Sequence, residues 1–283
     1  MRGVDRRVVL GLHRTRHDRG VLEAALDLGV RQLDTSYNYL RFASHRTLAD
    51  IAADLLPHFY LSTKIGFFGG SGAAAHCLDP VRLSDAARRS ADDLGRVPDV
   101  VFLHNPERSL RDVDVGSGLL ADACHALASI TDEGLCASWG ISSWDPRPVL
   151  RDWVDHAWPQ PEVIMCRAGL GGSAAVLAAA EQLTELTASR RWGMSPFGGS
   201  VTHPAWRSVD PRIFLRPGQE SSPLQAAFRV AYDIPQVDRV AVGTGSESHL
   251  GQLVSALSLE TDADALGRYR RLLAARQATA RSA

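Results

Sequence analysis

Short apolar runs alternate with amphipathic segments along most of the chain. The runs are rich in Val, Ile, Leu and Phe, and their apolar residues are nearly continuous rather than alternating with polar ones. This pattern is typical of parallel strands that are covered on both faces. Eight runs are predicted as strands, at residues 7–13, 30–36, 59–65, 99–105, 136–143, 162–169, 190–197 and 237–244.

The segments between these runs have the spacing and the terminal residues of helices. Asp18 is predicted to cap the first helix and Gly29 to end it, whereas Asp145 and Pro146 are predicted to begin another. Helices are predicted at 18–29, 44–56, 79–94, 118–133, 145–157, 173–188, 223–232, 246–257 and 262–277. Two longer connections, 66–78 and 198–222, are predicted as loops.

Eight strand–helix pairs in a chain of this length predict an α/β fold, a (β/α)8 TIM barrel with an extra C-terminal helix. A doubly wound open sheet is the alternative, but no G-x-G-x-x-G motif follows the first strand, where a dinucleotide fold would place it. The glycine-rich segment 69–77 matches neither that motif nor a P-loop and is interpreted as a loop. No linker is apparent, so we expect one domain over residues 1–283.

Composition narrows the class of protein further. Hydrophobic residues make up 45% of the chain, charged residues 22%, and the net charge is −1, which argues against a nucleic-acid or membrane partner. No apolar run approaches the roughly 20 residues of a membrane span, and no signal peptide is apparent. The four cysteines have no metal-ligand spacing. We expect a cytoplasmic protein without a metal; the sequence does not predict its oligomeric state.

One position stands out from the composition. Lys64, in the segment FYLSTKIGFF, is the only lysine, and every other basic residue that is not histidine is arginine. In a chain that uses arginine in place of lysine so consistently, surface lysines are replaced by arginine at little cost. A retained lysine is expected to need a compact charge with an adjustable pKa, which guanidinium does not supply. The alternative is chance retention.

Lys64 lies at the end of a predicted strand, together with other polar residues. In a barrel the reacting groups lie at the carboxyl ends of the strands. Asp34 and Tyr39 follow the second strand, and His104 ends the fourth. Taken singly, each has an ordinary interpretation: a turn cap, a packed rim aromatic and a core histidine. Together they predict a carboxylate, a phenol, an ammonium and an imidazole at one mouth.

At these residues the chain resembles the aldo-keto reductase family. The family pattern Asp-Thr-Ala-x-x-Tyr appears as DTSYNY, residues 34–39, and the family's strand-3 lysine and strand-4 histidine match Lys64 and His104. The segment WGISS is similar to the strand-5 motif that holds the nicotinamide carboxamide. MSPFGGS and VGTGSESHL resemble the strand-7 and strand-8 segments that follow the rest of the dinucleotide.

The resemblance implies a nicotinamide cofactor, NADPH with NADH possible, and a small carbonyl substrate. It implies catalytic roles for Asp34, Tyr39, Lys64 and His104. The residues it places beside the cofactor are Ser142, Ser143, Met165, Ser195, Pro196, Phe197, Gly198, Gly243, Thr244, Gly245, Ser246 and His249.

Several positions depart from the family pattern. Leu40 replaces the glycine that usually follows the tyrosine, and Met165 or Cys166 stands where the family has a glutamine. Met194 replaces an aromatic residue that stacks on the nicotinamide. The strand-8 loop has no arginine or lysine for a 2′-phosphate, and His249 falls nearest. These changes predict weaker discrimination between NADPH and NADH.

The implied mechanism is reduction of an aldehyde or ketone. Tyr39 would donate the proton as general acid, and the Lys64 ammonium, oriented by Asp34, would lower the tyrosine pKa toward neutrality. His104 would donate a hydrogen bond to the substrate oxygen. A keto-sugar or another small metabolite is one hypothesis for the substrate. Residues that are candidates to contact it, or else ordinary rim packing, are Tyr37, Phe67, Phe68, Trp144, Trp206 and 198–222.

Three other functions fit parts of the same pattern. A regulatory protein that binds the cofactor but turns over slowly would explain the changed cofactor positions. A lyase or isomerase that forms a Schiff base on Lys64 would explain the single lysine. A purely structural barrel would make four polar strand ends a coincidence.

Overall fold

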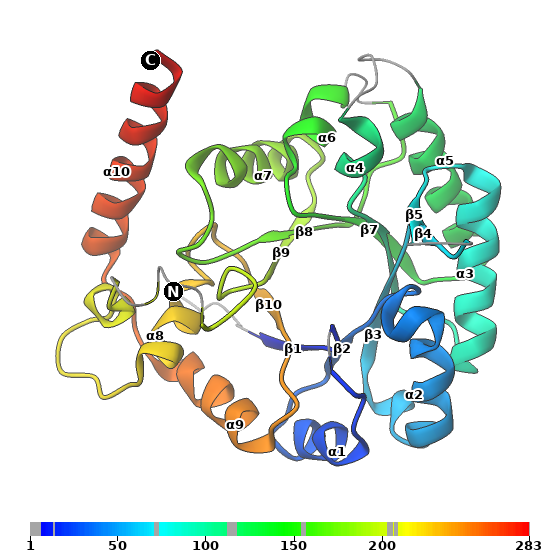
Figure 1. The fold of residues 1–283 in the computed structure, drawn as a ribbon, viewed down its shortest axis with the longest axis horizontal. Coiled ribbons are helices and arrows are strands. Elements are labelled where there is room, and N and C mark those ends of the chain that lie inside the picture. Colours follow the sequence, from blue (N-terminus) through cyan, green and yellow to red (C-terminus); the bar gives the residue numbers. More distant parts are fainter. Residues whose placement is uncertain are drawn as a thin grey trace.

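The fold is a closed parallel barrel surrounded by helices, seen in a computed structural model (Figure 1). The structure describes residues 7–13, 15–70, 74–111, 118–153, 157–202, 206 and 209–282. Eight strands close the barrel in the order β1-β10-β9-β8-β7-β6-β3-β2. The predicted (β/α)8 fold and the extra C-terminal helix are confirmed.

The barrel strands agree with the eight predicted runs. They are β1 (Arg7–Gly11), β2 (Gln32–Asp34), β3 (Tyr60–Ile65), β6 (Val100–His104), β7 (Ser138–Ser143), β8 (Val163–Arg167), β9 (Arg190–Met194) and β10 (Arg239–Val242). A short antiparallel hairpin, β4 (Phe67–Phe68) with β5 (Ala75–His76), stands where the sequence predicted only a loop. Phe67 and Phe68 are buried there, which supplies the reason for local order.

The helices also follow the prediction. They are α1 (Arg19–Asp27), α2 (Ser44–Ala52), α3 (Pro80–Leu94), α4 (Glu107–Leu110), α5 (Leu119–Asp132), α6 (Arg147–Asp152), α7 (Ala174–Leu186), α8 (Pro223–Val230), α9 (Glu247–Ser255) and α10 (Ala263–Ser282). The 3-10 turns are η1 (Tyr39–Phe42), η2 (Leu56–His58), η4 (Pro211–Phe214) and η5 (Ala256–Ser258). The short α4 was not predicted.

The predicted helix 145–157 is shorter in the structure. It begins at Arg147 rather than Pro146, although Asp145 still accepts a hydrogen bond from the Arg147 backbone N–H at 3.2 Å. Residues 154–156 of this prediction lie outside the described residues. The last helix, α10, extends away from the barrel in Figure 1.

Apolar side chains of the strands fill the barrel interior. Gly140 in β7 is needed there, because a Cβ at this position would lie 2.4 Å from the Val163 carbonyl oxygen and 2.8 Å from the Phe102 ring. The interior residues are Val9, Val100, Phe102, Val163, Met165, Trp192, Met194 and Ala241.

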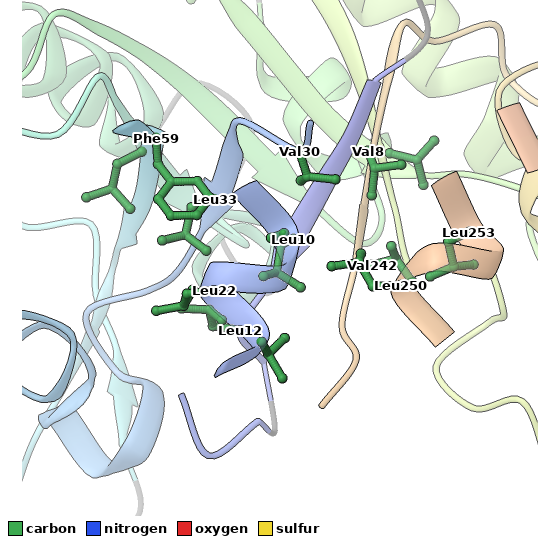
Figure 2. Close-up of a cluster of buried hydrophobic side chains, with 14 of the residues drawn as sticks. Val8, Leu10, Leu12, Leu22, Val30, Leu33, Phe59, Val242, Leu250 and Leu253 are labelled. Atoms are coloured by element: carbon green, nitrogen blue, oxygen red, sulfur yellow. The ribbon is translucent and has the colours of Figure 1, made fainter. Parts of the chain in front are cut away.

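A second apolar layer joins the strands to the helices. In Figure 2, Leu10 of β1 and Val242 of β10 lie in one cluster with Leu22 of α1 and Leu250 of α9. Burying one such leucine contributes about 1.5–3 kcal/mol relative to leaving it exposed. The layer therefore fixes the strand register on which the positions of the polar strand ends depend.

The carboxyl ends of the strands meet on one side of the barrel. Asp34 is opposite Ser62 in the β2–β3 register, His104 is opposite Ser142 in β6–β7, and Ser142 is opposite Met165 in β7–β8. Because neighbouring parallel strands are about 4.8 Å apart, His104, Ser142 and Met165 lie side by side across β6, β7 and β8.

Candidate active site

A cavity of about 990 Å³ opens at this end of the barrel. This is the upper range for ligand pockets in proteins. Asp34, Tyr39, Lys64 and His104, the four residues predicted to act as a group, all line it. The structure therefore brings the predicted carboxylate, phenol, ammonium and imidazole to one place.

Lys64 is buried in an ion pair. Its side chain is 3% exposed, its Nζ binds a carboxylate oxygen of Asp34, and it donates to the Thr35 carbonyl oxygen at 2.9 Å. The other Asp34 oxygen accepts from the Ser62 hydroxyl at 2.8 Å. Burial acts to lower the lysine pKa, but the Asp34 carboxylate and Tyr39 outweigh it and raise the pKa of Lys64. The ammonium is thus charged at neutral pH, which does not suit a Schiff-base lysine.

Tyr39 lies beside this ion pair. The Lys64 Nζ is 5.3 Å from the centre of the tyrosine ring, and the His104 ring centre is 6.4 Å away. Burial raises the pKa of Tyr39, and the Lys64 charge works against this shift without reversing it. From the sequence we expected a lowered pKa for Tyr39. This expectation was wrong because it considered the Lys64 ammonium but not the burial of the tyrosine. Tyr39 therefore holds its proton at neutral pH.

His104 is held by a serine that the family pattern does not have. The Ser36 hydroxyl lies 3.1 Å from His104 Nδ1, 2.7 Å from Asn38 Oδ1 and 3.2 Å from the Lys64 carbonyl oxygen. Burial, followed by the Lys64 charge, places the pKa of His104 well below 6.5, so the imidazole is neutral. The direction of the Ser36 bond decides which ring nitrogen carries the proton.

The backbone after Tyr39 takes an unusual course. Leu40, Arg41 and Phe42 have φ values of 49°, 56° and 72°, so three successive non-glycine residues are left-handed. Each such residue costs about 1–2 kcal/mol relative to a right-handed one. The family glycine at position 40 fits this conformation; here a leucine adopts it nonetheless.

A buried hydrogen-bond network supports Asp34 and Lys64 from behind. His17 Nε2 is 2.6 Å from the Ser44 hydroxyl, which is 2.6 Å from the hydroxyl of Thr35. His45 Nε2 is 2.7 Å from the Thr63 hydroxyl. Burial lowers the pKa of both histidines to about 4. Sequence reasoning missed this network, although a histidine beside a serine just after the tyrosine motif was a signal.

The opposite wall of the cavity is formed by β7 to β10. The Ser142 hydroxyl faces two sulfur atoms, those of Met165 and Met194, each at 3.8 Å. Ser195 has a φ of 55°, and its buried hydroxyl oxygen has no hydrogen-bond partner among the described residues. The Ser142 hydroxyl therefore has only weak thioether acceptors, whereas the Ser195 hydroxyl remains available to a ligand.

Small residues extend this wall toward α9. A Cβ on Gly243 would lie 3.2 Å from the Gly11 carbonyl oxygen and 3.3 Å from that of His13. Of the residues predicted beside the cofactor, the cavity is lined by Ser142, Met165, Ser195, Pro196, Phe197, Gly243, Thr244 and Gly245. A wall with two serine hydroxyls and close backbone approach fits a dinucleotide.

Four residues predicted for the cofactor do not line the cavity. The Ser143 hydroxyl donates to Glu107 at 2.9 Å, and the Ser246 hydroxyl caps α9 by accepting from the His249 backbone N–H. Gly198 and the exposed His249 also lie outside the lining. Their contact with a cofactor remains a prediction.

Glu107 is a buried acid that sequence reasoning did not single out. One of its oxygens accepts from the Ser143 hydroxyl, and the other accepts from the Trp144 backbone N–H, both at 2.9 Å. Burial raises the pKa of Glu107. The contacts join the end of β6 to the end of β7, which fixes where Trp144 enters the cavity wall.

Only part of the predicted substrate set reaches the cavity. Phe67 and Trp144 line it, and so do Gly199, Ser200 and Val201 of the predicted 198–222 loop. Tyr37 instead packs against Phe42 with ring centres 5.4 Å apart, Phe68 lies 4.2 Å beneath Arg82, and Trp206 donates to the Phe197 carbonyl oxygen. Unpredicted residues at this end are His13, Asn38, Asn105 and Arg108.

Comparison with known proteins identifies the family. The model described as the aldo/keto reductase family matches residues 15–166, just over half of the chain. The chain belongs to the aldo/keto reductase family. This membership supports an oxidoreductase that acts on carbonyl or alcohol groups. No curated protein matches the chain significantly.

Solved aldo-keto reductases have the same fold. AKR11C1 from Bacillus halodurans, in its holo form, has a TM-score of 0.73 and 17% identity, with 94% of this chain and 91% of that chain covered. The putative aldo-keto reductase PA4992 from Pseudomonas aeruginosa has a TM-score of 0.64 and 21% identity, covering 89% and 91%. At these identities the likeness concerns the fold alone.

Metal sites and membrane-spanning helices are two further kinds of feature. Within the described ranges, no group of three or more His, Cys, Asp and Glu residues is arranged to hold a metal ion. The helices of the same residues include none that is both long and apolar enough to cross a membrane.

Proposed function

We propose that this aldo/keto reductase is an NADPH-dependent reductase of small aldehydes or ketones, with Tyr39 as its general acid. One observation carries the proposal. A protonated phenol, a charged ammonium and a neutral imidazole line the same cavity, opposite a wall that carries the hydroxyls of Ser142 and Ser195. These are the groups that reduction of a carbonyl needs.

The cofactor would be held by residues of β7 to β10. Ser142 would bind the carboxamide between Met165 and Met194, and the small residues before α9 would accommodate the phosphates. A bound reduced nicotinamide supplies the electrons of the reduction as hydride.

The protein residues manage the charge and the proton. The carbonyl oxygen becomes negative during reduction and takes the proton that Tyr39 holds. The Lys64 ammonium, paired with Asp34, then stabilises the phenolate that remains. His104 orients the carbonyl, and it donates from Nε2 when Nδ1 accepts from the Ser36 hydroxyl.

The nucleotide preference is expected to be weak. Residues 243–249 contain no arginine or lysine, and Glu247 stands in the first turn of α9. The Asp18 carboxylate also lines the cavity. Carboxylates repel a 2′-phosphate but accept a ribose hydroxyl. NADPH remains the proposal on family grounds, and these acids make NADH a competent second cofactor.

A slow, cofactor-binding regulator is the second candidate. The observation that favours it is the pair of methionines, which offer the nicotinamide neither a ring to stack on nor an amide. Acid–base groups would then serve no purpose, which is why we place this function second.

Two measurements on the purified protein test the proposal. Titration with NADPH and NADH, followed by protein fluorescence, measures both dissociation constants; we expect both to bind. Steady-state reduction of a panel of aldehydes, followed at the nicotinamide absorbance, should then show turnover. Tight binding without turnover would support the regulator, and a strong NADH preference would overturn the assignment to NADPH.

A further inference from the structure

Charged side chains are unevenly distributed around the cavity. Its lining contains Arg16, Asp18, Asp34, Lys64 and Arg108. Asp34 neutralises Lys64 directly, and Asp18 is two residues from Arg16 in the loop before α1. Arg108 has no such compensation. Within the described part of the chain, no carboxylate and no hydrogen-bond acceptor contacts its side chain.

Arg108 is solvent-exposed, and two contacts describe where it lies. Its backbone N–H donates to the Asn105 carbonyl oxygen at 3.0 Å, in the turn that follows β6 and His104. Its guanidinium lies 5.3 Å from the centre of the Phe67 ring, where contact with the ring face holds it in place. Its charge is close enough to contribute to lowering the pKa of both His104 and His76. The Arg108 cation therefore lies on the cavity lining, close enough to His104 to affect its pKa.

We propose that Arg108 binds an anionic group of the substrate, so that the enzyme prefers carbonyl compounds that carry a carboxylate or a phosphate. This inference rests on the proposed reductase function and specifies its substrate class. A guanidinium offers paired N–H donors that match both kinds of anion, and a neutral substrate would leave them unpaired.

A neighbouring residue supports a polar substrate. Asn105 is 8% exposed and lines the cavity, and its Oδ1 has no hydrogen-bond partner among the described residues. With Trp144 and Phe67 as flat walls, this end of the cavity suits a small body bearing polar groups. The occupant is thus a compact oxo-acid or sugar phosphate rather than a large apolar ketone.

Matched pairs of aldehydes test the inference. With NADPH present, 3- and 4-carboxybenzaldehyde are compared with their neutral methyl esters, and glyceraldehyde 3-phosphate with glyceraldehyde. The first two pairs test a carboxylate, and the third tests a phosphate. We expect the anionic member of at least one pair to have a KM lower by roughly 10- to 100-fold, the effect of a charge-assisted hydrogen bond.

Variants assign that difference to one side chain. Arg108→Gln should abolish the preference by raising KM for the anion with little change in kcat, and Arg108→Lys should restore part of it. Arg111→Gln removes the same charge three residues further on, outside the cavity lining, and should leave the preference intact. Equal KM values within every pair, or a preference that survives Arg108→Gln, would overturn the inference while leaving the reductase function standing.

A binding measurement makes the result independent of turnover. Tryptophan fluorescence follows binding of 3- and 4-(hydroxymethyl)benzoate and glycerol 3-phosphate, the alcohol products of the three anionic aldehydes, to the full-length protein. Weaker binding in Arg108→Gln but not in Arg111→Gln supports the inference even if no aldehyde is reduced. Unchanged binding of all three products in Arg108→Gln contradicts it.

Discussion

The two walls of the cavity preserve the family pattern to different degrees. The wall from β2, β3 and β6 carries Asp34, Tyr39, Lys64 and His104, as aldo-keto reductases do. The wall from β7 to β10 has lost the glutamine and the stacking aromatic, and Met165 and Met194 stand in their places. In the proposed function, one wall would handle the proton and the other would hold the cofactor.

The difference follows from how each wall works. Acid–base residues depend on one another, because removing one partner of the Lys64–Asp34 pair leaves a buried charge uncompensated. Contacts along an extended dinucleotide are many and nearly independent, so single losses are tolerated. The proton-handling wall should therefore respond to substitution in turnover, and the cofactor wall in affinity.

Lys64→Arg is expected to have the largest effect. The guanidinium is too broad for a pocket in which the side chain is 3% exposed, so it must displace Asp34 or Tyr39. Turnover should fall by about 10²–10⁴, the contribution of general acid catalysis. Nucleotide affinity should change little, and the melting temperature reports any loss of stability. Full activity in this variant would show that the ammonium does not act on Tyr39.

His104→Ala should lower turnover by about 10²–10³, the usual cost of one oxyanion donor, while nucleotide binding is retained. Ser36→Ala is the matched control, since it keeps the imidazole and removes only the hydroxyl 3.1 Å from Nδ1. Its loss should be smaller. If His104→Ala turns over normally, His104 is a core histidine.

Acid should destabilise the proton-handling wall first. His17 and His45 have pKa values of about 4 when folded, against 6.5 when unfolded. Their burial as neutral groups is without cost above pH 6.5, and stability is lost as the pH falls from 6.5 to 4, by up to roughly 3 kcal/mol for each. Urea unfolding across this range measures the loss.

A matched variant assigns the acid effect. The Thr63 hydroxyl is 2.7 Å from His45 Nε2. His45→Gln keeps a hydrogen-bonding group beside this hydroxyl but cannot titrate. Its stability should depend less steeply on pH than that of the natural chain. Hydrogen exchange should show β2 and α2 opening before β7 to β10. An identical pH dependence would show that His45 is not the titrating group.

Met194→Tyr alters the cofactor wall and should have the smallest effect of these substitutions. Restoring a ring should raise nucleotide affinity by up to about tenfold, the worth of one aromatic contact, with little change in the chemical step. Met194→Leu has similar volume and no ring, and should bind as the natural chain does. Equal affinities in all three proteins would mean that position 194 does not face the nicotinamide.

The barrel and the four polar residues at its mouth could be predicted from the sequence because both have strong local signals. Continuous apolar runs marked the strands, and polar residues at their ends marked the mouth. The sign of the Tyr39 pKa shift could not be predicted, because it depends on burial by residues far along the chain. The Ser143–Glu107 bond also needed the folded β6–β7 register.

Other features were missed because their signals are weak in one sequence. The residue types of LRF, residues 40–42, do not predict three left-handed residues. Only glycine and asparagine favour that conformation strongly. Arg108 is one of many arginines in the chain. Its significance appears only when two facts are known: its position beside Phe67, and the lack of a carboxylate partner among the residues that the structure describes.

The most direct test of the account is Tyr39→Phe, studied with bound nucleotide. The phenylalanine keeps the ring against His13, 5.0 Å away between ring centres, and removes only the phenolic hydroxyl group. We predict that NADPH and NADH dissociation constants stay within about threefold of the natural values, while aldehyde reduction falls by about 10²–10⁴. Undiminished reduction, or a loss of nucleotide binding as large as the loss of turnover, would contradict the assignment of Tyr39 as the general acid.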